Sequence, residues 1–287
     1  MEKISNGIIE IGVEVHGAEL KNLKRLSDGR EYMFQADPKY WNRTSPVLFP
    51  LVGNYRDKRS VYNGKTYEMG QHGFARDMDF RLLEKRDTFV SFELTESPET
   101  LARWPFKFRL ILSYELKASS VIVGWHVENT GDDTMYYSIG GHPAFICDIN
   151  DSFFEFDPDE PDILKAGVIE PGGSGTLSDA VKDIPLEGGF LAIRPDLFDD
   201  DALIIENRKT SSVSLLDGNK ERFLTVRFDA PLFGLWSPAG KNAPFVCIEP
   251  WYGRCDRSTF EGNLEDREYG NSLTPGDKSD FHYTIEV

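Results

Sequence analysis

The stretch FRLILSYELKASSVIVGWHV, residues 108–127, carries apolar side chains at every second position. One row runs from Phe108 to Leu116, and a second runs from Val121 to Val127. Successive side chains of a strand point to opposite faces, so a period of two indicates a strand with one buried face. The sequence therefore predicts two half-buried strands in this stretch.

The same pattern recurs on both sides of these strands. Further alternating rows are Val90, Phe92 and Leu94; Leu224, Val226 and Phe228; and Tyr283, Ile285 and Val287. Turn signals lie between the rows at residues 63–64, 129–132, 217–219 and 275–277. Many strands joined by short turns predict an all-β sandwich or barrel.

Helical signals are few and short. Proline follows a helix-capping residue at Ser97-Pro98 and again at Asp37-Pro38, so we expect one- or two-turn helices on these connections. Residues 157–201 are rich in Asp, Glu, Gly and Pro. This composition predicts a long irregular excursion, with a hairpin, that rims a site.

The size and charge of the chain exclude several classes of protein. With 287 residues and 40% hydrophobic positions, we expect one folded domain spanning residues 1–287. A net charge of −16 argues against binding to nucleic acid. The N-terminus does not resemble a signal peptide, no run of 18 residues is apolar, and the three cysteines have no CxxC spacing. We therefore expect a cytoplasmic protein with reduced thiols and no membrane partner.

Periodicity divides the five histidines into two groups. His126 and His282 are out of phase with the apolar rows around them, and His16 stands at the end of a strand, so surface positions are expected for all three. His72 and His142 belong to no alternating row, and each has a glycine beside it. Glycine lets the backbone approach a ligand closely, which makes these two histidines candidates for a site.

A carboxylate joins them as a third candidate. His142 and Glu249 each precede a proline, which favours an extended backbone, so each is expected at the last position of a strand. Phe245, Cys247 and Glu249 share one face of the second strand, which directs Glu249 toward the interior. An interior carboxylate needs a partner or a chemical role.

An ordered set of segments resembles one known family along nearly the whole chain. The segments are GAEL (17–20), Trp41, SPVLFPLVG (45–53), QHGFAR (71–76), GGHPAF (140–145) and IEPW (248–251). The set resembles the aldose 1-epimerase, or galactose mutarotase-like, family, and in particular its bacterial branch found with lactose and galactose genes. This resemblance implies an all-β fold, a large antiparallel β-supersandwich with a few short helices on connections.

The resemblance also implies a reaction. The family interconverts the α and β anomers of a hexose, without a cofactor or metal. By resemblance, His142 is the general acid that protonates the ring oxygen, and Glu249 is the general base that takes the proton of the C1 hydroxyl. A histidine with a pKa near ~6.5 must gain proton affinity to start as an imidazolium, and a neighbouring carboxylate is expected to supply it.

Six further residues are expected to bind the sugar. By resemblance, His72 polarises it and Arg56 contacts it, with Arg76 as the competing arginine and Asp201 as the chosen member of three consecutive aspartates. Aromatic rings pack on the C–H face of a sugar, which adds Phe74 and Trp251. The expected partner is a small-molecule sugar, bound by a monomer or homodimer.

Three alternatives remain open at this stage. A cupin-type metal enzyme needs a His-x-His pair, which this sequence lacks. A non-catalytic carbohydrate-binding protein has no need of a matched acid and base. A hexose-6-phosphate 1-epimerase needs cations for the phosphate, and Arg43, Arg56, Lys58, Arg59 and Arg76 are candidates.

Overall fold

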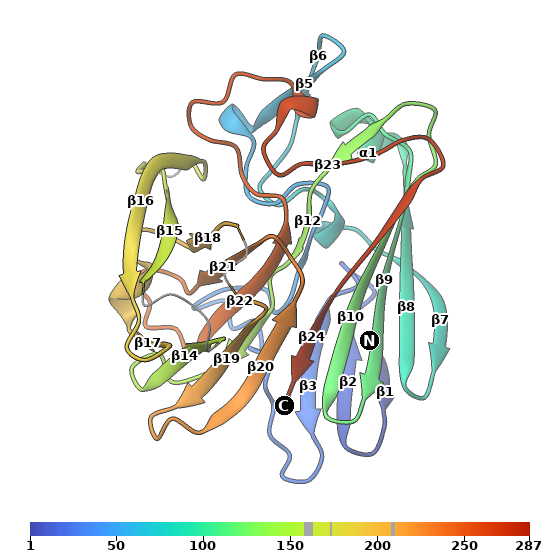
Figure 1. Cartoon of the computed structure of the whole chain (residues 1–287). Helices are drawn as coiled ribbons and strands as arrows, with labels where there is room; N and C mark the ends of the chain where they lie inside the picture. The colour runs from blue at the N-terminus through green and yellow to red at the C-terminus, as the bar shows by residue number, and fades with distance from the viewer. Residues whose placement is uncertain (158–162, 173, 208–209) are drawn as a thin grey trace.

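The computed structural model describes residues 1–157, 163–172, 174–207 and 210–287. The strands of this part form five sheets, and all pairs of neighbouring strands within them are antiparallel (Figure 1). Fold neighbours that are described below share this architecture, so the all-β prediction is confirmed.

The largest sheet has nine strands and includes the two strands predicted from residues 108–127. In spatial order the strands are β17 (Phe190–Ile193), β14 (Ser152–Phe156), β19 (Ser212–Asp217), β20 (Arg222–Phe228), β24 (Lys278–Glu286), β10 (Ser120–Asn129), β9 (Phe108–Lys117), β8 (Phe89–Thr95) and β7 (Arg81–Arg86). β9 and β10 pair along their whole length, from Phe108 with Asn129 to Lys117 with Ser120. Alternate residues of both strands are buried, as the period of two predicted.

The second sheet positions the candidate site. Its strands, in spatial order, are β16 (Leu177–Pro185), β15 (Ile163–Ile169), β18 (Leu203–Ile205), β21 (Leu232–Trp236), β22 (Phe245–Tyr252), β12 (Ile139–Gly141) and β4 (Val47–Leu48), with β13 (Ala144–Ile146) also paired to β22. β21 pairs with one edge of β22, and β12 and β13 share the other. β22 is buried along nearly its whole length because Val246 and Ile248 pack in the main core, whereas Phe245 and Cys247 pack in a smaller cluster on its other face.

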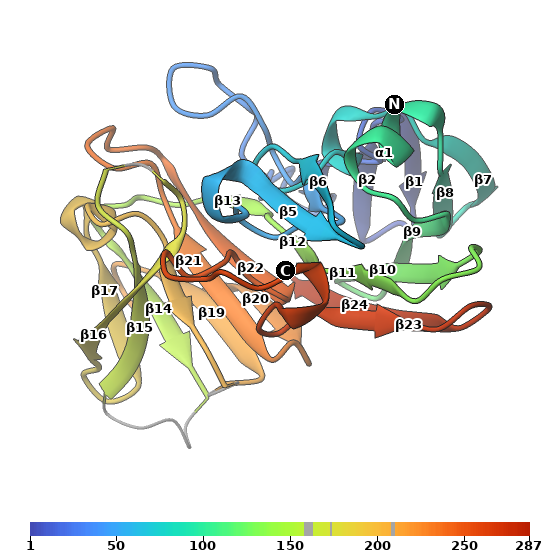
Figure 2. The ribbon, with the colours of Figure 1, turned by 90° about the horizontal axis from the view of Figure 1, so that it is seen from above.

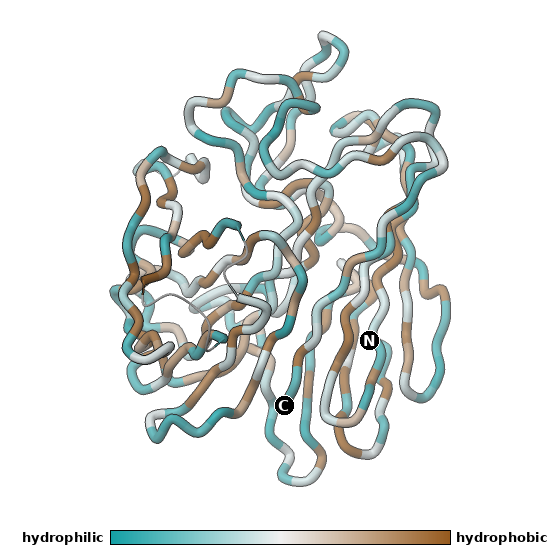
Figure 3. Tube along the Cα trace, in the orientation of Figure 1, coloured by the Kyte–Doolittle hydropathy of each residue, from teal (hydrophilic) through white to brown (hydrophobic). Residues whose placement is uncertain are grey.

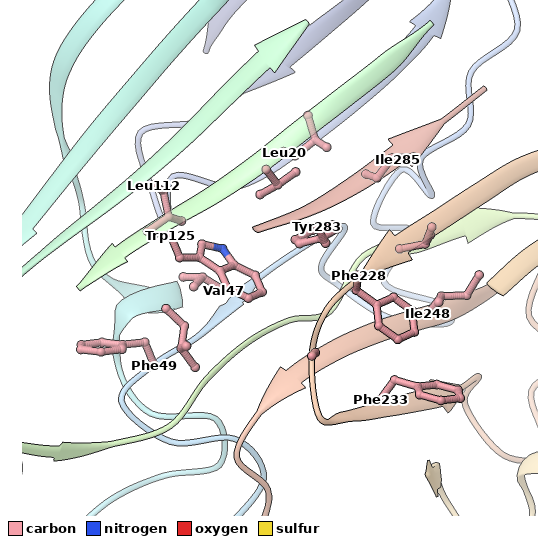
Figure 4. Close-up of a cluster of buried hydrophobic side chains, with 14 of the residues drawn as sticks. Leu20, Val47, Phe49, Leu112, Trp125, Phe228, Phe233, Ile248, Tyr283 and Ile285 are labelled. Carbon is pink, nitrogen blue, oxygen red and sulfur yellow. The ribbon is translucent and has the colours of Figure 1, made fainter. Parts of the chain in front are cut away.

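The two large sheets pack against each other through one apolar core. Most of the side chains labelled in Figure 4 come from these two sheets: Leu112, Trp125, Phe228, Tyr283 and Ile285 from the first sheet, and Val47, Phe233 and Ile248 from the second. Figure 3 shows hydrophobic colour along the strands and hydrophilic colour at outer turns. Truncating one buried aromatic ring of such a core costs about 3–5 kcal/mol, so the packing holds the second sheet firmly in place.

Three small sheets complete the strands. They contain β1 (Glu2–Ser5), β2 (Ile9–Val13) and β3 (Leu20–Arg25); β5 (Arg59–Tyr62) and β6 (Lys65–Glu68); and β11 (Met135–Tyr137) and β23 (Asn271–Leu273). The first of them lies beside β8 and β9 (Figure 2) and joins the same core. The turn predicted at Asn63-Gly64 joins β5 to β6, with positive φ at both residues.

The described helices are short, as predicted. They are α1 (Pro98–Arg103) and the 3₁₀ turns η1 (Arg56–Lys58), η2 (Ala75–Asp77), η3 (Pro195–Phe198) and η4 (Leu264–Asp266). Ser97 caps α1 by accepting a hydrogen bond from the Thr100 amide, which confirms the first helical prediction. The second prediction holds only as a single turn and not as a regular helix. The amides of Tyr40 and Trp41 both donate to the Asp37 carbonyl, and Trp41 packs on Trp236.

The segment at residues 157–201 is more regular than its composition suggested. The predicted hairpin is present as β15 and β16, and its acidic residues occupy the exposed face while Leu164 and Ala166 are buried. Residues 158–162 and 173 of this segment lie outside the described part. All three cysteines are buried and unpaired, and none of the described helices is long and apolar enough to cross a membrane.

Candidate active site

A cavity of about 460 Å³ opens over the second sheet, between β18, β21, β22 and the chain around His72. Six of the eight site residues predicted from the sequence line it: His72, Arg76, His142, Asp201, Glu249 and Trp251. Trp41, Gln71, Asp199 and Trp236 also contribute to the wall. The structure therefore brings together residues from distant parts of the chain.

Two prolines explain how His142 and Glu249 come to face each other. The edge of β22 pairs with β13 at Phe245 to Cys247 and with β12 at Trp251 and Tyr252, and His142-Pro143 forms the break between β12 and β13. Pro250, which has no N–H to donate, lies opposite this break, so no ladder hydrogen bond is lost. Glu249 consequently lies within β22 and not at its end as predicted, whereas His142 does directly follow its strand.

The two side chains meet at the base of the cavity. Nε2 of His142 lies 3.3 Å from Oε2 of Glu249, and the carboxylate is only 1% exposed. The His142 ring is held between two indoles, with its centroid 4.8 Å from that of Trp41 and 5.4 Å from that of Trp236. Nδ1 of His142 and Oε2 of Glu249 have no hydrogen-bond partner among the described residues. Both polar groups are thus oriented by packing, and both residues line the cavity.

Burial determines where the proton of this pair resides. Burial is the main cause that lowers the pKa of His142 to about 3, and the positive charge of Arg76 contributes to the same shift. Burial also raises the pKa of Glu249 well above its ordinary value, with repulsion from Asp201 in the same direction and the Trp251 indole opposing it. The imidazolium expected from the sequence is therefore not favoured in the ligand-free cavity, because desolvation outweighs the attraction between the two charges. Both shifts favour a neutral imidazole and a protonated carboxyl group over the ion pair.

His72 has a defined tautomer. Its Nδ1 accepts a hydrogen bond from the Gly53 amide at 3.0 Å, and its own amide donates to the Gly53 carbonyl at 2.7 Å. Burial lowers the pKa of His72 well below its usual range, so the ring is neutral and carries its proton on Nε2. The residue adopts φ of +65°, an uncommon conformation for a side chain of this size. These contacts present an N–H donor to the cavity.

The two candidate arginines have different surroundings. Arg76 lines the cavity, its Nη2 donates to the Gln71 carbonyl at 2.7 Å, and its Nε has no hydrogen-bond partner among the described residues. Burial lowers the pKa of Arg76 to about 10, which leaves it cationic at neutral pH. Arg56 does not reach the cavity wall, because the η1 turn directs its guanidinium to the Phe260 carbonyl at 2.8 Å. Arg76 is thus the arginine available to a ligand.

The two predicted aromatic contacts also separate. Trp251 lines the cavity, and its indole has room because both neighbouring strands carry glycine, where a Cβ at Gly140 or Gly234 would lie 2.6 Å from it. Phe74 is absent from the cavity wall. It is 1% exposed and packs in the core against Phe49, since the chain reverses at Gly73 directly after His72.

The cluster of three aspartates is resolved by its contacts. Asp199 and Asp201 line the cavity, whereas Asp200 pairs with Lys182 at 3.1 Å on the outside. Asp201 accepts a hydrogen bond from the Ala202 amide at 2.8 Å, which fixes the carboxylate at the rim. Asp201 is the aspartate that the sequence predicted at the cavity, whereas Asp199 was not predicted there.

The aromatic wall was the main omission from the sequence-based site. Trp41 was noted only as part of a motif, and Trp236 was not among the six residues expected to bind the sugar. Trp236 ends β21 and pairs with Cys247 of the neighbouring strand β22, two residues before Glu249. This pairing places the indole at the site.

One group of side chains at the base of the cavity can hold a metal ion. The ligand atoms of His142, Cys247 and Glu249 all lie within 4.8 Å of one another. Burial raises the pKa of the Cys247 thiol well above its ordinary value, so the thiol is protonated in the absence of a cation.

The comparison with known families is decisive at this point. The model of the family described as "Aldose 1-epimerase" matches residues 3–286.

The chain belongs to the aldose 1-epimerase family.

Relatives of the chain agree with this assignment. Protein LacX (chromosomal) of Lactococcus lactis is 32% identical over 301 residues, which cover 99% of this chain and 98% of LacX. A galactose mutarotase related enzyme from Lactobacillus acidophilus has a similar structure, with a TM-score of 0.93, 34% identity, and coverage of 99% of this chain and 96% of that one. A galactose mutarotase-like protein from Lactobacillus casei gives a TM-score of 0.93 and 31% identity, covering 100% and 99%. This member of the aldose 1-epimerase family therefore has the galactose mutarotase-like fold that the resemblance implied.

Proposed function

We propose that this protein is an aldose 1-epimerase that interconverts the α and β anomers of a hexose, with His142 and Glu249 as the acid–base pair. The observation that carries the proposal is the 3.3 Å approach of Nε2 of His142 to Oε2 of Glu249 at the base of the cavity. Membership of the aldose 1-epimerase family supports the reaction class.

The reaction needs one proton acceptor and one proton donor that can exchange roles. Ring opening removes the proton of the C1 hydroxyl and adds a proton to the ring oxygen. Rotation about the C1–C2 bond then exposes the other face of the aldehyde, and the same transfers in reverse close the ring. A pair that shares a single proton always contains one acceptor and one donor. Each positioned transfer contributes about 10²–10⁴ in rate.

The proposed roles require the shared proton to move when sugar binds. In the ligand-free cavity, burial favours the proton on Glu249, whereas the acid role of His142 needs the proton on the imidazole. Sugar hydroxyls that donate to Oε2 of Glu249 stabilise the carboxylate, and the Trp251 indole acts in the same direction. Sugar binding thus prepares the general acid and the general base together.

The remaining wall residues suit a hydroxyl-rich ligand. The Nε2–H of His72 and the Arg76 guanidinium are donors, and the Asp201 carboxylate at the rim is an acceptor. The indoles of Trp41 and Trp251 provide flat apolar surfaces for the C–H face of a sugar ring. A hexose carries both the hydroxyl groups and the C–H face that these side chains suit.

The charges of the cavity favour an uncharged sugar over a sugar phosphate. Arg76 is the only cation among the described residues that line it, and Asp199 and Asp201 oppose it there. Arg59 pairs with Asp57 at 3.6 Å, outside the cavity wall, and so supplies no phosphate contact. The acid–base pair also distinguishes the protein from a carbohydrate-binding module, which needs no proton transfer.

An anomerisation screen tests the proposal. Freshly dissolved α-glucose, α-galactose and other α-aldoses are followed by polarimetry and proton NMR, with and without enzyme. At least one free aldose should reach its anomeric equilibrium faster with the protein, and glucose 6-phosphate should respond less than the best free sugar. Acceleration of none of these sugars would refute an epimerase function.

A further inference from the structure

A third side chain, the Cys247 thiol, stands beside the acid–base pair. Cys247 precedes Glu249 by two residues on β22, so both side chains project from the same face of the strand. It is paired with Ala144, two residues beyond His142. The strand register therefore brings an imidazole, a thiol and a carboxylate to one point, with their ligand atoms within 4.8 Å of one another.

The spacing of two of these atoms matches a tetrahedral metal site. Zn–N and Zn–O bonds of about 2.0–2.2 Å at a tetrahedral angle place the two ligand atoms about 3.3–3.5 Å apart. The measured separation of Nε2 of His142 and Oε2 of Glu249 is 3.3 Å. A Zn–S bond of about 2.3 Å requires the sulfur to come within ~3.6 Å of the other two atoms. The sulfur therefore has to move by up to about 1.2 Å, which a rotation of the Cys247 side chain can supply.

The pair also offers coordination capacity that the protein leaves unused. Oε2 of Glu249 is buried and has no hydrogen-bond partner among the described residues, and both His142 and Glu249 face the cavity. Three protein ligands with a fourth position open to a cavity is the arrangement of an exchangeable zinc site. Sulfur and nitrogen donors select thiophilic cations over Mg²⁺ and Ca²⁺, which prefer oxygen.

We propose that His142, Cys247 and Glu249 form a binding site for a thiophilic divalent cation such as Zn²⁺, and that this cation inhibits the enzyme reversibly. The bound cation occupies the imidazole nitrogen and the carboxylate oxygen that the proposed reaction uses, so sugar turnover and metal binding exclude each other. The inhibition rests on the proposed function, whereas the metal site itself does not.

Cobalt titration tests the site directly, because a Co²⁺–thiolate bond produces an ultraviolet charge-transfer band. The full-length protein is titrated with Co²⁺ alone, under reducing conditions, as wild type, Cys247→Ala and Cys147→Ala. Cys147 is the matched control, since it is also a buried free cysteine but does not belong to the cluster. The band should saturate at one equivalent in the wild type and in Cys147→Ala, and be absent in Cys247→Ala.

Surface histidines cannot imitate this result. His16 beside Asp79 and His126 beside Asp280 can bind cobalt, but they have no sulfur ligand. Glu249→Gln should keep the band and weaken cobalt binding by at least the ~10–100-fold that loss of an outer-shell partner causes. This second variant keeps the test decisive if Cys247→Ala does not fold. A wild type without the band, or a band unchanged in a folded Cys247→Ala protein, would overturn the metal site.

The inhibition has a separate test. Zn²⁺ should slow anomer exchange by the wild type and by Cys147→Ala, and Cys247→Ala should require at least about tenfold more Zn²⁺ for the same loss. Equal sensitivity of the two cysteine variants would refute inhibition through Cys247. A protein that shows the cobalt band but accelerates no aldose would refute the epimerase proposal and leave the metal site standing.

Discussion

His142 and Glu249 are neighbours because both precede a proline at the same place in the second sheet. The break between β12 and β13 at His142-Pro143 lies opposite Glu249-Pro250 on β22, and it brings Nε2 of the imidazole to 3.3 Å from Oε2 of the carboxylate. The interruption of one strand therefore admits the histidine side chain beside the continuous neighbouring strand. The site depends on this local geometry.

The pH profile of activity should be flat through the ordinary titration range of histidine. The pair can gain a further proton only at His142, whose pKa is about 3. It loses its own proton from Glu249, whose pKa is raised. We expect kcat/KM to change by less than about twofold between pH 5.5 and 7, where a histidine with pKa ~6.5 would lose most of its charge. A drop in kcat/KM with a midpoint near pH 6.5 would contradict the assigned protonation state.

The Glu249→Gln variant should be more stable than the wild type, by an amount that increases with pH. The folded pKa of Glu249 lies above its unfolded value of 4.5. The stability associated with the protonated carboxyl is therefore present below pH 4.5 and is lost as pH rises through the folded pKa, whereas glutamine does not titrate. The difference in unfolding free energy should grow by up to ~1.4 kcal/mol per pH unit between pH 4.5 and the folded pKa, and level off above it. Urea unfolding at pH 5 and pH 7 measures it, and a difference that shrinks with pH would reverse the sign of the pKa shift.

Arg76 and Arg56 provide a matched pair of substitutions. Arg76→Ala removes the only cation among the described cavity residues, so KM should rise by about 10–100-fold, as expected for a lost charged hydrogen bond. Arg56→Ala should change KM by less than about twofold, because that guanidinium bonds to the Phe260 carbonyl outside the cavity wall. Initial rates over a range of sugar concentration separate the two, and equal losses would show that Arg76 has no special role.

Asparagine at position 72 isolates the role of the second histidine. Asparagine tolerates positive φ, so His72→Asn preserves the backbone at φ of +65° and removes the Nε2–H donor. We expect KM to rise and kcat to fall, each by about tenfold, if this donor binds the sugar more strongly as charge develops. His16→Asn, at an exposed histidine, is the control. A change in KM alone would reduce His72 to a binding residue.

Local patterns in the sequence predicted several of the strands and singled out His142 and Glu249, which the structure brings together. Alternation identified the row from Phe108 to Leu116 because one face of β9 is buried by a single core. The His-Pro and Glu-Pro dipeptides identified His142 and Glu249 because proline has to lie where a sheet can lose an N–H. The extent of the domain, predicted as residues 1–287, stays a prediction.

Other features depend on tertiary contacts that no local pattern contains. Arg56 and Phe74 belong to motifs beside the site, but the η1 turn and the reversal at Gly73 direct their side chains elsewhere. The protonation of His142 follows from burial under two tryptophans from distant segments. Sequence spacing indicated which residues gather, and not the dielectric environment they share.

The central claim is that the His142–Glu249 pair transfers the protons of anomerisation, and two-dimensional exchange NMR at anomeric equilibrium tests it most directly. On the best aldose of the screen, the wild type should give exchange cross-peaks between the α and β anomers. His142→Asn and Glu249→Gln should remain folded and bind the sugar, and each should exchange the anomers about 10²–10⁴-fold more slowly. Exchange at the wild-type rate in either variant would contradict the account.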